Sequence, residues 1–194
     1  MSTNVALFIG SLRRESLNRK LAKALKRLGP DGWQYHEIEF GNLPLYNGDE
    51  AQPMPSDVKQ MKVRISSADA IIFVTPEYNR SVPGGLKNAI DWASRPHGEN
   101  SFAGRPTLVC GTSPGNISTA VAQQHLRTML AYLDAPAMGQ PEVFIRFQPE
   151  DLISDDGEVT IQSTEKFLKK VMSEFEDWVE VVRSGSEALK ATAV

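Results

Sequence analysis

Short apolar runs alternate with amphipathic, helix-like stretches along the chain, and this alternation most constrains its fold. The runs are continuously apolar, as in Ala70 to Val74, which is typical of strands buried on both faces of a parallel sheet. Between them, apolar residues recur at three- and four-residue spacing, as they do along one face of a helix. The pattern predicts strands over 4–10, 34–40, 70–74, 106–111 and 142–147, and helices over roughly 17–28, 56–68, 86–93, 122–133 and 163–182.

Five strands that alternate with five helices predict an α/β fold, because each parallel crossover needs a covering helix and has one preferred hand. We expect a flavodoxin-like, doubly wound five-stranded parallel sheet of order 2-1-3-4-5, with helices on both faces. The second strand, interrupted by His36, Glu37 and Glu39, should lie at an edge. Residues 1–183 form a single domain in this interpretation, and 184–194, which has few large apolar residues, is expected to be a mobile tail.

Composition excludes several classes of protein. A net charge of -3, with 41% hydrophobic and 23% charged residues, gives no reason to expect a nucleic-acid partner. No apolar run is long enough to span a bilayer and no signal peptide is evident, so a soluble, cytoplasmic protein is expected. The lone Cys110 is interpreted as a core residue. The three histidines have no spacing that indicates metal ligation, so no metal site is expected.

The loop after the first strand, Ser11 to Asn18, has the composition of a site for one phosphate. It lacks the glycines of G-x-G-x-x-G and the lysine of a P-loop, but Ser11, Ser16 and Asn18 place short polar side chains just before a helix. A helix N-terminus favours an anion, and Arg13 adds a positive charge, which suits the terminal phosphate of a mononucleotide. Alternatively, Ser16 and Asn18 only cap the helix and the arginine is solvated.

The loop after the third strand, Thr75 to Gly85, should lie beside the first loop at the switch point of the sheet. Tyr78 could contact a ring, and Asn79 with nearby main-chain N–H groups could bind the edge of a heterocycle. A further loop, Thr112 to Ile117, ends the neighbouring strand and carries Ser113. These three polar loops are therefore expected to meet where one ligand would bind.

Four motifs together identify a family resemblance. They are Gly10-Ser-Leu-Arg-x-x-Ser-x-Asn18, Pro76-Glu-Tyr-Asn79, Pro83-Gly-x-Leu-Lys-Asn-Ala-Ile-Asp-Trp-Ala93 and Gly111-Thr-Ser-Pro-Gly115. They resemble the NADPH-dependent FMN reductase family, and most of all its bacterial quinone, chromate and ferric reductases. The resemblance runs from the first strand to the last helix.

The resemblance implies non-covalent FMN, with its phosphate at the first loop, its ring along the second and the far side of the ring completed by the third. It also implies NADPH or NADH as electron donor, and a homodimer or homotetramer whose neighbouring subunit helps to wall the flavin pocket. The expected FMN-binding residues are Ser11, Leu12, Arg13, Ser16, Leu17, Asn18, Pro76, Glu77, Tyr78, Asn79, Arg80 and Ser113.

The expected activity is a ping-pong reaction, in which NAD(P)H reduces the flavin and an acceptor then oxidises it, so no protein nucleophile is needed. Glu77 is interpreted as a structural hydrogen-bond acceptor rather than as a general acid or base. Arg80 and Arg95 are candidates to orient nicotinamide phosphates or an anionic acceptor. Alternatively, either pairs with an acid such as Glu142 at a subunit interface. Some relatives carry an aromatic residue in place of Arg80, so their acceptor preference does not transfer directly.

Quinones are the expected acceptors, with ferric complexes, chromate and azo compounds as further ones. The alternative is a flavodoxin-like FMN electron carrier that does not itself oxidise NAD(P)H. The two arginines and the only mildly acidic net charge favour the enzyme. A nucleotide-sensing interaction protein without flavin is a third class, and no motif supports it.

Overall fold

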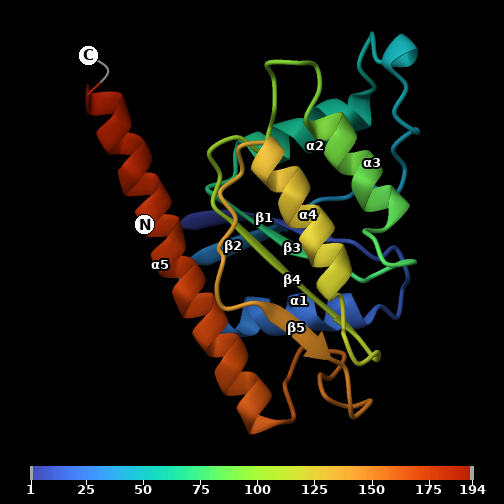
Figure 1. Ribbon diagram of the computed structural model, residues 1–194, viewed down its shortest axis with the longest axis vertical. Coiled ribbons are helices and arrows are strands. Elements are labelled where there is room, and N and C mark those ends of the chain that lie inside the picture. Colours follow the sequence, from blue (N-terminus) through green and yellow to red (C-terminus); the bar gives the residue numbers. More distant parts are fainter. Residues whose placement is uncertain (1, 193–194) are drawn as a thin grey trace.

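A five-stranded parallel sheet forms the centre of the molecule (Figure 1). The computed structural model describes residues 2–192, apart from the side chains of Lys190 and Thr192. The strand order is β2-β1-β3-β4-β5, and every neighbouring pair is parallel, which confirms the predicted sheet. The strands are β1 (Thr3–Ile9), β2 (Trp33–Glu37), β3 (Ala70–Val74), β4 (Thr107–Ser113) and β5 (Val143–Arg146).

Helices cover both faces of the sheet, as the alternating pattern predicts. Helices α1 and α5 pack on one face, where strand residues such as Leu7 and Ile72 point, and α2, α3 and α4 pack on the other face with Phe8 and Phe73. Side chains of successive strand residues point to opposite faces, so each strand contributes to both cores. The helices are α1 (Leu17–Leu28), α2 (Ser56–Ser66), α3 (Gly84–Ala93), α4 (Ala120–Tyr132) and α5 (Gln162–Thr192), with a short 3-10 helix, η1 (Gly48–Glu50).

The middle and the edges of the sheet differ in burial in the way their sequences indicate. All five residues of β3 are buried, and Phe73 stacks on Phe8 with ring centroids 4.6 Å apart. In the edge strand β5, buried and exposed residues alternate, and β2 has no buried residue at all. A strand with neighbours and helices on all sides must be apolar throughout, whereas an edge strand tolerates polar side chains.

The start of α2 and the end of α5 are not what sequence alone suggests. Serine is a common cap residue, but Ser56 is the first residue of α2 and Pro55 is its cap residue, and the Ser56 hydroxyl bonds Asp57 at 3.1 Å. Helix α5 runs to Thr192 rather than ending near 182, so 184–192 is helical. This end projects away from the sheet (Figure 1) and needs no apolar stripe, which is why the pattern missed it. Residues 193–194 of the predicted tail lie outside the described residues, and its mobility stays a prediction.

The parallel strands end at one edge of the sheet, which we call the carboxyl edge, and begin at the opposite amino edge. At the carboxyl edge, Gly10 N–H donates to the Val74 carbonyl and Thr75 N–H donates to the Cys110 carbonyl, both at 2.9 Å. These bonds extend the sheet by one residue and bring the loops after β1, β3 and β4 side by side.

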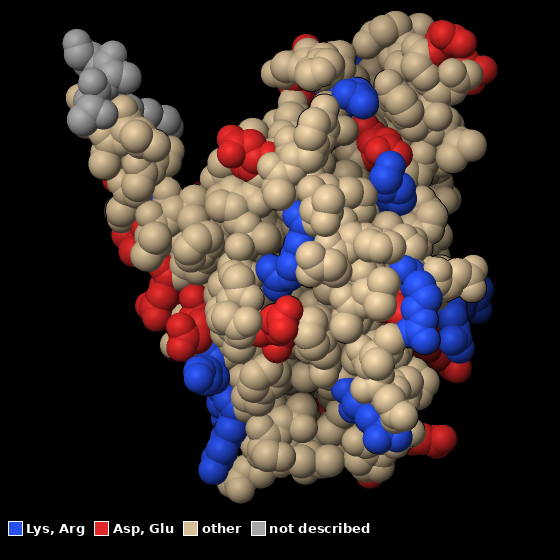
Figure 2. Space-filling model, viewed as in Figure 1, with Lys and Arg blue, Asp and Glu red and all other residues tan. Residues whose placement is uncertain are grey.

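The surface carries mixed charge. Basic and acidic side chains are interspersed on the face drawn in Figure 2, with no continuous basic patch among the residues described there. Within 2–192, no helix is both long enough and apolar enough to cross a membrane.

Candidate functional site

A pocket of about 310 Å³ opens at the carboxyl edge, between the loops that follow β1 and β3. We call it the switch-point pocket, because β1 and β3 are the two strands between which the chain reverses its direction across the sheet. Two large side chains at this pocket are open to solvent, since Leu12 is 62% exposed and Tyr78 is 45% exposed. The lining residues are Gly10, Leu12, Arg13, Tyr78, Pro83, Gly84 and Gly85.

The buried polar residues of the loop after β1 bond the main chain. Ser16 caps α1 by accepting a hydrogen bond from Arg19 N–H, and Ser11 Oγ accepts one from Arg13 N–H, both at 3.4 Å. Asn18 bonds Thr112 at the end of β4 twice, donating from Nδ2 to the carbonyl at 2.9 Å and accepting from the N–H at 3.0 Å. Ser16 therefore caps α1, and Asn18 fastens α1 to β4.

The same loop still has groups that could hold an anion. No acidic residue lies in the first turn of α1, so the positive end of the helix dipole is not offset there. Arg13 is exposed, and its guanidinium has no ion-pair partner within the described part of the chain. Leu17 is partly buried and packs against the core beneath this helix end. A phosphate contact at this loop stays a prediction, and Arg13 is its most accessible donor.

A tight turn in the loop after β3 fixes Tyr78 at the pocket. Tyr78 and Ser81 exchange two main-chain hydrogen bonds, of 2.9 Å and 3.0 Å, around Asn79 and Arg80. Both central residues have positive φ, 51° and 62°, as a type I′ turn requires. Asparagine is common in this conformation, whereas arginine is unusual. The turn is further bonded to α4, where Ser81 Oγ lies 3.1 Å from His125 Nδ1.

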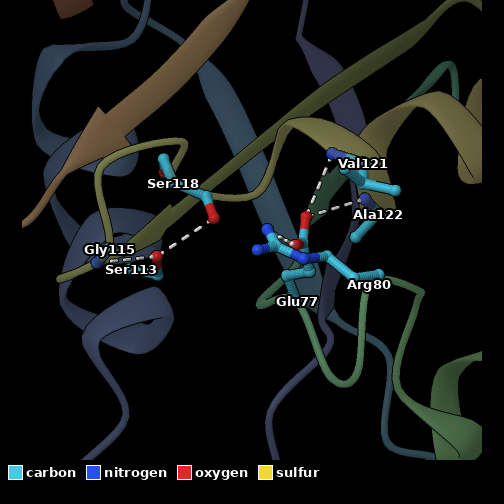
Figure 3. Close-up of polar contacts among 7 residues, drawn as sticks. All are labelled: Glu77, Arg80, Ser113, Gly115, Ser118, Val121 and Ala122. Carbon is cyan, nitrogen blue, oxygen red and sulfur yellow. Dashed lines mark hydrogen bonds and ion pairs between the residues drawn. The ribbon is translucent and has the colours of Figure 1, made fainter.

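Glu77 caps α4 from this loop (Figure 3). One carboxylate oxygen accepts the N–H groups of Val121 and Ala122 at 3.0 Å each, and the other bonds Arg80 at 3.2 Å. The cap residue of α4 itself, Thr119, makes no side-chain capping bond, so Glu77 supplies the missing acceptor. The Glu77 side chain is only 8% exposed. The structure thus assigns Glu77 the acceptor role expected for it.

The loop after β4 lies at the same edge, but its serine is bonded within the loop. Ser113 Oγ donates to the Ser118 carbonyl at 3.0 Å and accepts from Gly115 N–H at 3.2 Å (Figure 3). Ser113 is not among the pocket-lining residues. Cys110, earlier in β4, is fully buried, and burial raises the pKa of its thiol well above the ordinary value. It is therefore a core residue rather than a nucleophile.

Arg80 and Arg95, the two candidate orienting residues, lie at different ends of α3. Gly84, at the pocket, begins α3, and Arg95 follows the opposite end of this helix. A ten-residue helix is roughly 14 Å long, so Arg95 lies toward the amino edge. Arg80 follows the pocket-lining Tyr78 by two residues and is highly exposed. Arg95 therefore lies away from the switch-point pocket of its own chain.

Sequence reasoning missed part of the lining. Gly10, Pro83, Gly84 and Gly85 were assigned no contact with a ligand, yet all four line the pocket. A Cβ at Gly84 would meet no atom within 4 Å, so this position opens directly into free space. One signal could have identified them. A pair of glycines begins the helix that follows a buried strand and its loop, and main chain without side chains lets a ligand approach closely.

The polar residues of α3 have structural partners. Asn88 bonds the Tyr46 N–H and the Pro44 carbonyl, and Trp92 Nε1 donates to the same carbonyl at 2.8 Å. Lys87 pairs with Asp91 one turn away at 2.7 Å. This part of the family motif therefore holds the segment after β2 against α3.

The pocket chemistry fits FMN. Tyr78 and Leu12 offer an aromatic and an aliphatic surface to a flat ring, Gly84 and Gly85 leave room beside it, and Arg13 provides a cation for a phosphate. Main-chain N–H groups of Glu77 and Asn79 have no acceptor within the described residues, and could bond the edge of a heterocycle.

Comparison with known proteins agrees with this site. Residues 3–150 match the model of a family described as NADPH-dependent FMN reductase. A 2-hydroxy-1,4-benzoquinone reductase of Burkholderia sp. is 44% identical over 92% of this chain and 97% of that protein. A quinone reductase of Escherichia coli K12 is 37% identical over 92% of this chain and 96% of that protein.

A solved structure is similar throughout. It is FerB, a flavoenzyme NAD(P)H:(acceptor) oxidoreductase from Paracoccus denitrificans, with a TM-score of 0.87 and 45% identity over 92% of this chain and 97% of that one. Residues 3–150, which match the family model, include all three loops of the carboxyl edge. On these grounds, the chain belongs to the NADPH-dependent FMN reductase family.

Proposed function

We propose that this chain reduces quinones with electrons from NADPH or NADH, using FMN held non-covalently in the switch-point pocket. The observation that carries the proposal is an open pocket between the loops of β1 and β3, lined by an aromatic ring, an arginine and bare glycine main chain, in a member of this family. Because the pocket is open to solvent, the electron donor and the acceptor can each reach the same face of a bound ring in turn.

The chain's own groups have binding and orienting roles in this reaction. Bound FMN supplies the redox chemistry, since it accepts two electrons from the nicotinamide and returns them to the acceptor. Arg13 and the N-terminus of α1 would hold its phosphate. Tyr78 would contact its ring, and the N–H groups of Glu77 and Asn79 would bond the edge of the ring and favour negative charge there. Glu77 and the Tyr78–Ser81 turn keep this loop in place, bonded to α4.

Quinones are proposed because two relatives named as quinone reductases are 44% and 37% identical to this chain over the aligned residues. Ferric complexes, chromate and azo compounds are proposed as further acceptors. Arg80, exposed on the turn beside Tyr78, is positioned to attract an anionic acceptor or a nicotinamide phosphate.

A homodimer or homotetramer is part of the proposal, because the pocket leaves Leu12 and Tyr78 largely uncovered. A neighbouring subunit that covers this rim would complete the pocket, and it could bring its own Arg95 to the ligand. The cytoplasmic location expected from the sequence stays a prediction.

An anaerobic reduction experiment tests the function. The purified protein is reconstituted with FMN, freed of unbound flavin, and mixed with NADPH or NADH in the absence of oxygen. We expect rapid loss of the visible flavin absorbance, and its return when a quinone is added. A flavin that binds but stays oxidised would identify an electron carrier, and a protein that cannot retain FMN would contradict both flavin functions.

A further inference from the structure

The start of the connection from α3 to β4, residues 94–106, is held by a lysine of α2 that bonds only main-chain carbonyls. Lys62 of α2 donates from Nζ to three main-chain carbonyls, those of Ala93 at 3.0 Å, Arg95 at 2.5 Å and Glu99 at 2.7 Å. An ammonium has three N–H donors, so this set uses all of them. Partial burial lowers the pKa of Lys62. The hydrogen-bond partners of its ammonium are main-chain carbonyls rather than a carboxylate.

The rest of the connection is anchored as firmly. Phe102 is fully buried in the core, and Asn100 donates to the Leu133 carbonyl at 2.5 Å. Arg105 donates to the carbonyls of Ser66 and Ala68 at the end of α2, and to that of Ala103. Two cations bonded to carbonyls therefore hold the two ends of this connection against α2.

The connection presents the Arg95 guanidinium without a partner among the described residues. Lys62 holds the carbonyl of Arg95, and the Arg95 N–H donates to the Trp92 carbonyl at 3.2 Å. The guanidinium, by contrast, makes no hydrogen bond or ion pair within residues 2–192. A firmly fixed main chain that bears an unpaired cation is the arrangement expected of a side chain that acts on something outside its own fold.

We propose that Lys62 is a positioning residue for Arg95: its ammonium sets the main chain from which the Arg95 guanidinium reaches an anionic substrate at a neighbouring copy's switch-point pocket. This inference rests on the proposed function, and it assigns Lys62 an effect on substrate discrimination rather than on FMN binding. Lys62 acts only through Arg95, so the effects of changing the two residues cannot be independent.

A double-variant experiment tests this dependence in the FMN-loaded protein. The readout is the kcat/KM for ferricyanide, an anionic acceptor, divided by that for benzoquinone, a neutral one. We expect Arg95→Ala and Lys62→Met each to change this ratio by about threefold or more in the same direction, and the combined variant to change it no further than Arg95→Ala alone. Lys62→Arg, which keeps N–H donors near the carbonyls, should restore most of the original ratio.

Lys59→Met is the matched control, because Lys59 is an exposed lysine of the same helix. It should leave the ratio unchanged. The proposal is overturned if Lys62→Met behaves like Lys59→Met, if Arg95→Ala leaves the ratio unchanged, or if the effects of Lys62→Met and Arg95→Ala multiply. Should Lys62→Met not fold, Lys62→Gln, which removes the charge but keeps an N–H donor, takes its place with and without Arg95→Ala; a shift of the ratio caused by Lys62→Gln that persists without Arg95 contradicts the proposal. A parent protein that is not reduced by NAD(P)H would instead refute the proposed function.

Discussion

At each of two opposite edges of the sheet, a charged side chain bonds main-chain groups at one end of a helix, and the two charges have opposite sign. At the carboxyl edge, the Glu77 carboxylate accepts N–H groups at the start of α4. Toward the amino edge, the Lys62 ammonium donates to carbonyls at the end of α3 and just beyond it. Each sign matches the partial charge of its helix end, since unpaired N–H groups lie at the N-terminus and unpaired C=O groups at the C-terminus.

The comparison shows why a charged residue in a loop motif is weak evidence for catalysis. Glu77 lies in the loop beside the switch-point pocket, yet both of its oxygens are occupied by the protein itself. Lys62 bonds main-chain carbonyls and is not near that pocket, yet it holds the main chain of Arg95. In both loops the charged group that bonds the main chain leaves another residue, Tyr78 or Arg95, available for a ligand.

The largest expected effect is that of Glu77→Ala, which should lower the free energy of unfolding by about 3 kcal/mol. The variant leaves two partly buried N–H groups at the start of α4 without an acceptor and removes the ion pair with Arg80. Glu77→Gln keeps one acceptor oxygen and should lose about half as much. Denaturant unfolding of the flavin-free protein measures both. A change below that of an ordinary surface substitution for Glu77→Ala would contradict the capping role.

Asn18→Ala should cost about 2 kcal/mol of unfolding free energy, because it leaves the buried N–H and C=O of Thr112 without partners. The neutral Asn18 amide both donates to and accepts from the main chain, whereas the Glu77 carboxylate only accepts and the Lys62 ammonium only donates. Asn42→Ala, at an exposed asparagine of the loop after β2, is the control and should have little effect. Equal unfolding midpoints for the two variants would show that the Thr112 bonds contribute nothing.

Lys62→Met should cost about 1 kcal/mol of unfolding free energy, less than Glu77→Ala. Lys62 is only partly buried, so water can reach some of the carbonyls that lose their donor. Thermal and denaturant unfolding, compared with Lys59→Met, measure the difference. A larger loss of unfolding free energy for Lys62→Met than for Glu77→Ala would contradict the prediction that the carboxylate contributes more to stability than the ammonium.

An effect as small as that of Lys62→Met is expected at the strained turn of Arg80. Glycine adopts positive φ freely, whereas alanine does not, so Arg80→Gly should be more stable than Arg80→Ala by about 1 kcal/mol. Both variants lose the same ion pair with Glu77, so the difference isolates the backbone conformation. Paired unfolding curves decide this, and an alanine variant as stable as the glycine variant would argue against the turn geometry.

The sequence predicted the sheet because burial leaves a local signature. Each central strand is covered on both faces and is apolar throughout, as Ala70–Val74 is, so strands and helices could be recognised from spacing alone. The helical end of α5 beyond residue 182 could not be recognised in this way. Its residues from 183 to 189 are exposed, so no apolar periodicity marks them.

The site was predicted in its place but only partly in its residues. Strand order brings Leu12, Arg13 and Tyr78 to one pocket, as expected. The hydrogen-bond partners of Asn18 and Ser113 depend on main-chain positions far along the sequence or on a local turn, and no spacing rule indicates them. The role predicted for Arg95 stays a prediction, because this residue follows the end of α3 that is opposite to the pocket.

The affinity for FMN of a variant with a filled pocket tests most directly whether the switch-point pocket holds the cofactor. Gly84→Leu adds a side chain where a Cβ meets no neighbour, and Gly139→Leu does the same at a position outside the pocket. Titration of flavin-free protein with FMN should show a Kd raised by about tenfold or more for Gly84→Leu and unchanged for Gly139→Leu, with both variants folded. FMN binding by Gly84→Leu as tight as that of the parent protein would contradict this placement.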